Sequence, residues 1–129
     1  MSARPAAVLL IVACTGLSSF LTGCNDGAQQ SAAALTGGDP GRGRVVILKY
    51  GCGSCHTIAG ISSAHGLVGP PLSNIGVRMY IAGVLPNTPD NIVQWIRNPK
   101  QVDEKTAMPV LGVSAPEATD MAAYLYSIR

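Results

Sequence analysis

Apolar residues recur at helical spacing in the last part of the chain. In residues 115–128 the apolar positions follow i, i+3, i+4 intervals, namely Ala118, Met121, Ala122, Leu125 and Ile128. Ser114 and Glu117 stand three residues apart at the start of this segment, which is the pattern of a capping box. The pattern predicts a helix that packs one face against a core.

Two further helices are predicted by their start signals. In "NTPDNIVQWIRNP", Thr88 is the expected N-cap and Pro89 the first helical residue, and the Asn-Pro pair ends the helix. In "DPGRGRVVILKYG", Asp39 and Pro40 give the same signals. The β-branched residues in this second segment also permit a strand, but helix is favoured.

The remaining segments lack a helical period. Residues 58–76 are rich in Gly, Ser and Pro and are predicted to be a loop, residues 77–85 a short helix or turn, and residues 99–113 irregular. Loops this long in a small domain indicate that the chain wraps around something. Aromatic residues make up only 5% of the chain, and a bulky apolar cofactor would compensate for that shortage in the core.

The N-terminal segment 1–23 has the pattern of an export signal. Arg4 gives a positive start, and the uncharged run from Ala6 to Leu21 is short for a membrane span, which needs about 20 residues. The segment runs into "LTGC", which resembles the lipobox of bacterial lipoproteins. That resemblance implies cleavage before Cys24, lipid on Cys24 and an exported protein on the periplasmic side of a bacterial membrane. An ordinary signal that leaves a free thiol, or an uncleaved anchor, are the alternatives.

Residues 24–38 are small and polar and show no apolar period, so we expect the lipidated cysteine to be followed by a flexible tether. The folded domain is then expected to span residues 39–129. The chain carries 12% charged residues and a formal net charge of +2, with no basic cluster. This charge balance excludes nucleic acid as an expected partner.

The motif "CGSCH", residues 52–56, allows three kinds of site. A zinc site needs four ligands, but beyond the two thiols the chain offers only His56 and His65, at unsuitable spacing. A thioredoxin-like dithiol needs a βαβ context, which the pattern lacks. C-x-x-C-H is the attachment motif of c-type haem, in which Cys52 and Cys55 reach the two vinyl groups and His56 reaches the iron.

The iron needs a sixth ligand or an open site, and a methionine sulfur raises the reduction potential and suits electron transfer. Met121 belongs to the apolar stripe of the last helix, and Met79 is expected to be core or partly exposed. Met108 lies in the irregular segment before a proline, and a methionine on such a loop can approach the iron from the face opposite His56. His65 is a rival axial ligand, although an exposed loop histidine is favoured.

Four motifs in order resemble the class I cytochromes c, over nearly all of residues 41–129. They are "CGSCH", "GPPL" at 69–72, "WIRNPKQVDEKTAMP" and "DMAAYLYSI". The resemblance implies a small all-α cytochrome c fold, with three to five helices and long loops wrapped around one covalent haem.

Residue roles follow from the resemblance. It implies thioether bonds from Cys52 and Cys55, iron ligation by His56 and Met108, and a hydrogen bond from the His56 ring to the Pro70 carbonyl. Further haem contacts are implied for Thr106 and, more loosely, Arg78 and Tyr80, all toward a propionate, and for Trp95 as a pocket aromatic. The lysine ring of the mitochondrial members is not matched, because Asp103 and Glu104 interrupt the lysines available here, Lys49, Lys100 and Lys105.

The expected function is one-electron transfer through one covalent haem c with its iron, without enzymatic chemistry. Donor and acceptor are expected to be redox proteins, drawn from oxidases, quinol-oxidising complexes and periplasmic dehydrogenases. One alternative is a haem-relay subunit of an oxidase or dehydrogenase complex. Another is a haem enzyme or sensor with an open iron site, but no polar catalytic cluster appears near Met108.

Overall fold

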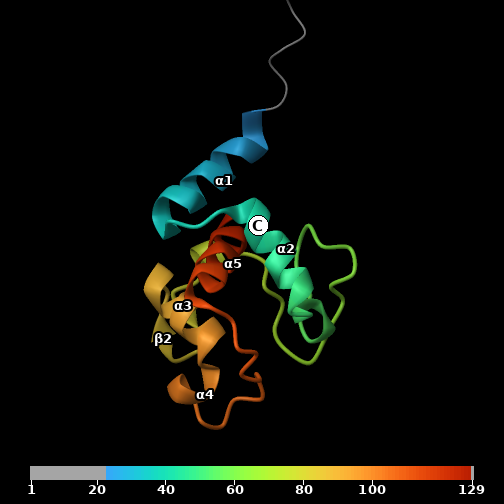
Figure 1. Cartoon of the computed structure of the whole chain (residues 1–129), viewed down its shortest axis with the longest axis vertical. Helices are drawn as coiled ribbons and strands as arrows, with labels where there is room; N and C mark the ends of the chain where they lie inside the picture. The colour runs from blue at the N-terminus through green and yellow to red at the C-terminus, as the bar shows by residue number, and fades with distance from the viewer. Residues whose placement is uncertain (1–22, 129) are drawn as a thin grey trace, which may run out of the picture.

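The computed structural model describes residues 23–128, which form a mostly helical domain (Figure 1). The α-helices are α1 (Gly23–Thr36), α2 (Pro40–Lys49), α3 (Pro89–Arg97), α4 (Pro99–Val102) and α5 (Ala115–Ser127). Two 3-10 turns, η1 (Cys52–Ser54) and η2 (Ile75–Val77), and a small hairpin of β1 (Tyr80–Ile81) and β2 (Leu85–Pro86) complete the element order. The all-α prediction is confirmed.

The predicted start signals of the helices are present as hydrogen bonds. The Asp39 side chain accepts from the backbone N–H of Arg42 at 2.8 Å, and this residue caps α2, so helix rather than strand is the outcome there. Thr88 caps α3 in the same way. Ser114 and Glu117 bond reciprocally at the start of α5, as a capping box requires.

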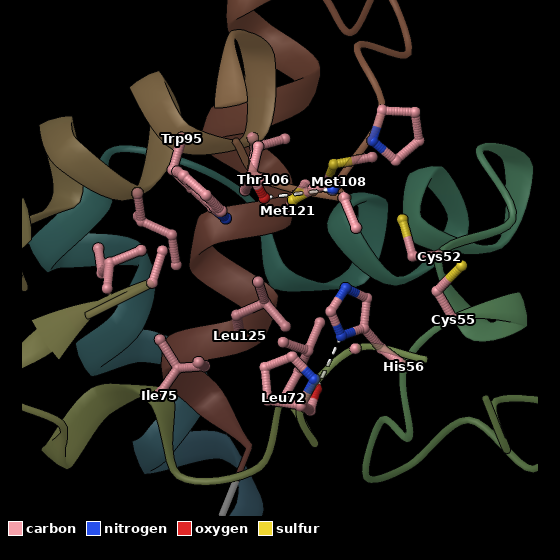
Figure 2. A pocket seen from close by; sticks show the side chains of 18 of the residues that line it. Cys52, Cys55, His56, Leu72, Ile75, Trp95, Thr106, Met108, Met121 and Leu125 are labelled. Atoms are coloured by element: carbon pink, nitrogen blue, oxygen red, sulfur yellow. Dashed lines mark hydrogen bonds between the residues drawn. The ribbon is translucent and has the colours of Figure 1, made fainter. Parts of the chain in front are cut away.

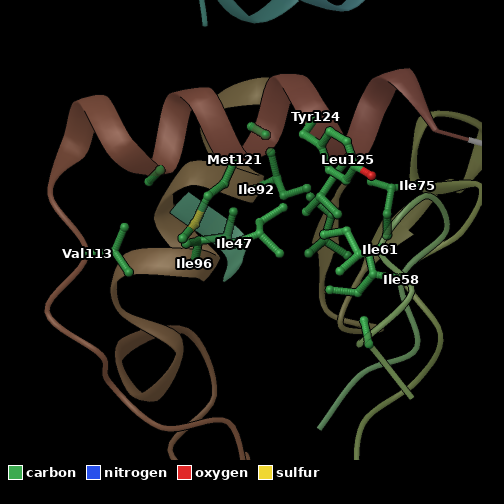
Figure 3. Packing of buried hydrophobic residues seen from close by; sticks show 14 residues of the cluster. Ile47, Ile58, Ile61, Ile75, Ile92, Ile96, Val113, Met121, Tyr124 and Leu125 are labelled. Carbon is green, nitrogen blue, oxygen red and sulfur yellow. The ribbon is translucent and has the colours of Figure 1, made fainter. Parts of the chain in front are cut away.

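The core is built where α2 and α5 pack together, with α3 against α5 (Figure 3). Gly43 lies at the α2–α5 contact, and a Cβ on it would collide with the backbone carbonyl of Asp120. The two backbones therefore approach closely, which brings their apolar side chains into one cluster. Its buried members include Ile47, Ile75, Ile92, Ile96, Met121 and Leu125.

A charged group fixes the start of α2 to α5. The Asp120 carboxylate is buried and accepts from Arg42 Nε at 2.8 Å, from Arg42 Nη2 at 2.9 Å and from the Asp39 N–H at 2.7 Å. The hydrogen bond from Arg42 is the main cause that lowers the pKa of Asp120. These three hydrogen bonds stabilise the carboxylate in its charged form.

A second charged group ties the end of α2 to the start of α5. Glu117 accepts from Lys49 Nζ at 2.7 Å and from the Tyr50 hydroxyl at 2.9 Å, besides its capping bonds to Ser114. These hydrogen bonds, the one from Lys49 first, lower the pKa of Glu117 from 4.5 to about 2. The two helices are thus linked by polar contacts at both ends of α2.

Two segments differ from their predictions. Residues 77–85, predicted as a short helix or turn, contain most of the β1–β2 hairpin, in which Ile81 lies opposite Leu85. Each strand has two residues, which is too short to leave an alternating pattern in the sequence. The irregular segment 99–113 begins with the short helix α4.

The prediction of a flexible tether is wrong for the residues that α1 covers, because Gly23–Thr36 is a helix that packs on α5. Ala and Gln are strong helix formers, and an Ala-rich segment can be helical without a stripe of large apolar residues. The predicted signal, residues 1–23, lies almost wholly outside the described residues. No helix among those described is both long and apolar enough to cross a membrane.

Replacing Gly43 with Ala should lower the free energy of unfolding by about 1–3 kcal/mol, because the added methyl group forces α2 and α5 apart. Chemical denaturation of the haem-loaded protein measures the change. Gly27→Ala is the matched control, since nothing lies within 4 Å of a Cβ there. Equal stability of the two variants would contradict the close helix contact.

Acid should weaken the α2–α5 connection through Glu117. Because its folded pKa lies below its unfolded value, the contribution of Glu117 is fully present above about pH 4.5 and is lost as pH falls toward 2. Glu117→Gln should therefore flatten the loss of stability over this range, measured by thermal unfolding at several pH values. Glu104→Gln, at an exposed position, should leave the profile as it is.

Candidate functional site

One cavity of about 470 Å³ lies between α2, α3, α5 and the loops that join them. All nine residues predicted to contact a cofactor line it: Cys52, Cys55, His56, Pro70, Arg78, Tyr80, Trp95, Thr106 and Met108. In Figure 2 the two cysteines lie on one side of the pocket and Trp95 on the other, with His56 and Met108 between them. His65 is exposed and does not line the cavity, as expected for a loop histidine.

The C-x-x-C-H motif folds as a tight turn directly after α2. Cys52–Ser54 form η1, and the N–H groups of Cys55 and His56 both donate to the Cys52 carbonyl, at 3.3 and 3.0 Å. The turn is held to the next loop by the Gly69 N–H, which donates to the Cys55 carbonyl at 2.8 Å. Cys52, Cys55 and His56 all line the same cavity.

The His56 ring is fixed from two directions. Its Nδ1 lies 2.7 Å from the Pro70 carbonyl, and this contact requires the proton on Nδ1 because a carbonyl can only accept. In the neutral ring this tautomer leaves the Nε2 lone pair available as a metal ligand. Gly69 lies against the ring so closely that a Cβ there would collide with Cε1. The ring is therefore oriented by contacts within the protein itself.

The Cys52 thiol lacks the lowered pKa of a nucleophilic cysteine. Both thiols of the motif are free rather than joined as a disulfide, and burial is the main cause that raises the pKa of Cys52, with Cys55 adding to the rise. A zinc site has no support either, since no group of three or more His, Cys, Asp or Glu side chains is placed to hold a metal among the residues described.

The segment that carries Met108 is held by its neighbours. The Met108 N–H donates to the Thr106 hydroxyl oxygen at 3.2 Å. Lys100 Nζ, on α4, donates to the backbone carbonyls of Glu104 and Thr106. This role of Lys100 was missed from the sequence, where a lone lysine is most simply a solvated charge, and no spacing signals a bond to carbonyls.

The other predicted residues occupy different parts of the cavity. Trp95 is half-buried in the wall, and Tyr80 is exposed at the rim. Arg78 lines the cavity while its Nη2 donates to the carbonyls of Pro71 and Ser73, at 2.6 and 3.0 Å, so part of its guanidinium already serves the loop that carries Pro70.

Met79, Met121 and Met108 differ in their exposure and in whether they line the cavity. Met79 is 81% exposed, beyond the partial exposure expected of it, and does not line the cavity. Met121 is 1% exposed, as its place on the helical stripe predicts, and its side chain also forms part of the cavity wall. Met108 is the methionine that combines a place in the cavity with a position on a loop.

The cavity suits a haem. Its walls are mainly apolar, from Ile47, Leu72, Ile75, Ile92, Ile96 and Leu125 among others, and its volume falls in the range of cofactor pockets. The two thiols lie at its edge, and the His56 ring, packed on the Gly69 backbone, has Nε2 free. A large apolar ring system with one metal needs these features.

Comparison with known proteins agrees with the site. The cytochrome c family model matches residues 41–129. A relative, cytochrome c oxidase subunit 2 of Alkalihalophilus pseudofirmus, is 34% identical over 89 residues, which are 68% of this chain and 25% of the relative. No solved structure matches the chain. The chain thus spans about a quarter of that curated relative.

The family binds haem c, with its iron, covalently through the C-x-x-C-H motif, and Cys52 and Cys55 occupy the two thiol positions here. The matched region contains every residue that lines the cavity. The fold, the motif and the match lead to the same conclusion. This chain belongs to the cytochrome c family.

Proposed function

We propose that this protein is a single-haem electron carrier with His/Met ligation, held by lipid at the periplasmic side of a bacterial membrane. Haem-based electron transfer is the function that the family match supports. The observation that carries the finer proposal is that His56 and Met108 line the same cavity as Cys52 and Cys55. A fixed imidazole and a thioether are the pair of ligands that suits electron transfer.

Each of these residues has a defined task. Cys52 and Cys55 hold the haem by thioether bonds, and when bound the haem supplies an iron that takes up and releases one electron. His56 presents Nε2 to the iron, while the bond from Nδ1 to the Pro70 carbonyl fixes the ring and increases its basicity. Met108 supplies a soft sulfur, which favours the reduced state and raises the potential.

The surroundings favour electron transfer over chemistry on a substrate. Apolar walls exclude water, and the hydrogen bonds that hold Thr106, Met108 and Lys100 limit movement of the loop. Thr106 lies two residues before Met108, and its hydroxyl oxygen already accepts from the Met108 N–H. A rigid, dry pocket keeps the reorganisation cost of a change in iron charge low.

Partners are proposed to be redox proteins at the membrane, with the electron passing from a reduced donor to an oxidised acceptor. The export signal pattern and the lipobox-like "LTGC" support attachment at Cys24. A relay subunit in an oxidase is the second candidate, because a relative of the haem domain is an oxidase subunit 2. Co-purification from membranes separates the two, since a subunit stays with its complex in mild detergent and a carrier does not.

Replacing Met108 with Ala should abolish the weak sulfur-to-iron charge-transfer band of the oxidised protein and lower the reduction potential, because the iron loses its soft ligand. Visible absorption spectra and a redox titration of the haem-loaded protein measure both effects. Met79→Ala is the matched control, since Met79 is 81% exposed and outside the cavity. It should leave the band and the potential unchanged.

If the Met108→Ala variant keeps the sulfur band, Met108 is not the ligand and His/Met ligation through this residue is wrong. If the unmodified protein binds haem but has no sulfur band, the open-site interpretation takes precedence. A chain that incorporates no haem at all would overturn the functional proposal.

A further inference from the structure

We infer that α1 is a fixed spacer, which sets the distance and orientation of the haem pocket relative to Cys24. The inference rests on the proposed function in one respect, because α1 spaces the haem pocket from a membrane only if Cys24 carries the lipid. The sequence pattern predicts a flexible tether here, which would let the domain move freely over the membrane. The contacts of α1 with the domain argue against such freedom.

Helix α1 is packed on the domain rather than extended from it. It packs on α5, and it also touches α2 and α3. Among the α1 side chains that the structure describes, those of residues 27–36, Ala32 is buried at 3% exposure. Ala123 of α5 is completely buried, and neither residue belongs to the main hydrophobic cluster. Small buried residues on both helices allow their backbones to approach closely. The α1 side of this contact lies outside the family-matched residues 41–129, and the α5 side lies within them.

The connection between α1 and α2 is short and fully bonded. The Gly37 N–H donates to the Ala33 carbonyl at 2.8 Å, and the Gly38 N–H donates to the Thr36 hydroxyl oxygen at 3.1 Å. A Cβ at Gly38 would collide with the Thr119 carbonyl of α5. One residue further, the Asp39 N–H is bonded to the buried Asp120 carboxylate. Each successive backbone N–H therefore has a partner, and no hinge separates α1 from the domain.

The position of α1 at one end of the molecule determines how far the haem pocket lies from Cys24. Along the long axis of the molecule, α1 lies at one end, and α4 lies at the other end with the segment that leads to Met108 (Figure 1). As a helix of 14 residues, α1 is about 21 Å long. A lipid at Cys24 would thus hold the haem pocket away from the membrane surface. The matching partner is a redox protein whose docking site also stands clear of the lipid.

The rigidity is tested by a dye on the Cys24 thiol of haem-loaded residues 24–129, exported through a signal without a lipobox. The haem quenches the dye by energy transfer, so the fluorescence lifetimes report the distribution of distances. A single narrow population is expected. Ala33→Pro should broaden the distribution and shift it, because proline breaks the helix between the dye and the domain.

Ala34→Gln is the matched control, since Ala34 is exposed and glutamine is a good helix former, and it should reproduce the narrow distribution. The absorption spectrum of each variant checks that the haem domain is intact. If Ala33→Pro alters that spectrum, Ala32→Gln tests the same contact by placing a long side chain at the buried position. An unmodified chain whose distribution is as broad as that of the proline variant would overturn the inference.

A second arm measures distance from a membrane. The same thiol is coupled to maleimide lipid in phosphatidylcholine vesicles that contain a headgroup fluorophore, and quenching by the haem is recorded. The unmodified protein should quench less than Ala33→Pro, and equal quenching would overturn the spacer. Because the coupling is chemical, this result is independent of whether cells lipidate Cys24. Failure of the proposed function would instead appear as a missing haem or a missing sulfur band.

Discussion

The close contact of α2 with α5 is the constraint on which the rest of this structure depends. Gly43 lets the two backbones meet at Asp120, and the Arg42–Asp120 and Lys49–Glu117 pairs hold the ends of α2 in place. The haem motif begins three residues after α2 ends, so the helix contact determines where both thiols and His56 lie. The cavity is then closed by loops that have little regular structure of their own.

The helix starts and the haem-binding motif could be predicted from the sequence, because each is determined by residues that are close together in the chain. Asp39, Thr88 and Ser114 mark helix starts by their own hydrogen bonds, and a C-x-x-C-H motif carries its chemistry within five residues. The resemblance to a known family then supplied Pro70, whose carbonyl lies 2.7 Å from His56 Nδ1. That contact joins residues 14 apart, and no local pattern would have indicated it.

The features that were missed depend on tertiary contacts. The segment 24–38 has the composition of a linker, but its alanines are also strong helix formers, and α5 offers a surface on which they pack. Lys100 has the sequence context of a solvated charge, yet it donates to two carbonyls of the Met108 segment. Alanine occurs in linkers and in helices, and lysine occurs as a solvated charge and as a donor to carbonyl groups. Which of these is found depends on the tertiary contacts that the segment makes.

The central claim is that the cavity holds a haem iron between His56 and Met108. The most direct measurement is the proton NMR spectrum of the reduced, haem-loaded protein with its methionine methyl groups isotope-labelled. A methyl group bound at the iron lies over the haem ring, so the ring current should shift the Met108 resonance far upfield, while that of Met79 stays near its ordinary position. A Met108 resonance without this shift would contradict the account.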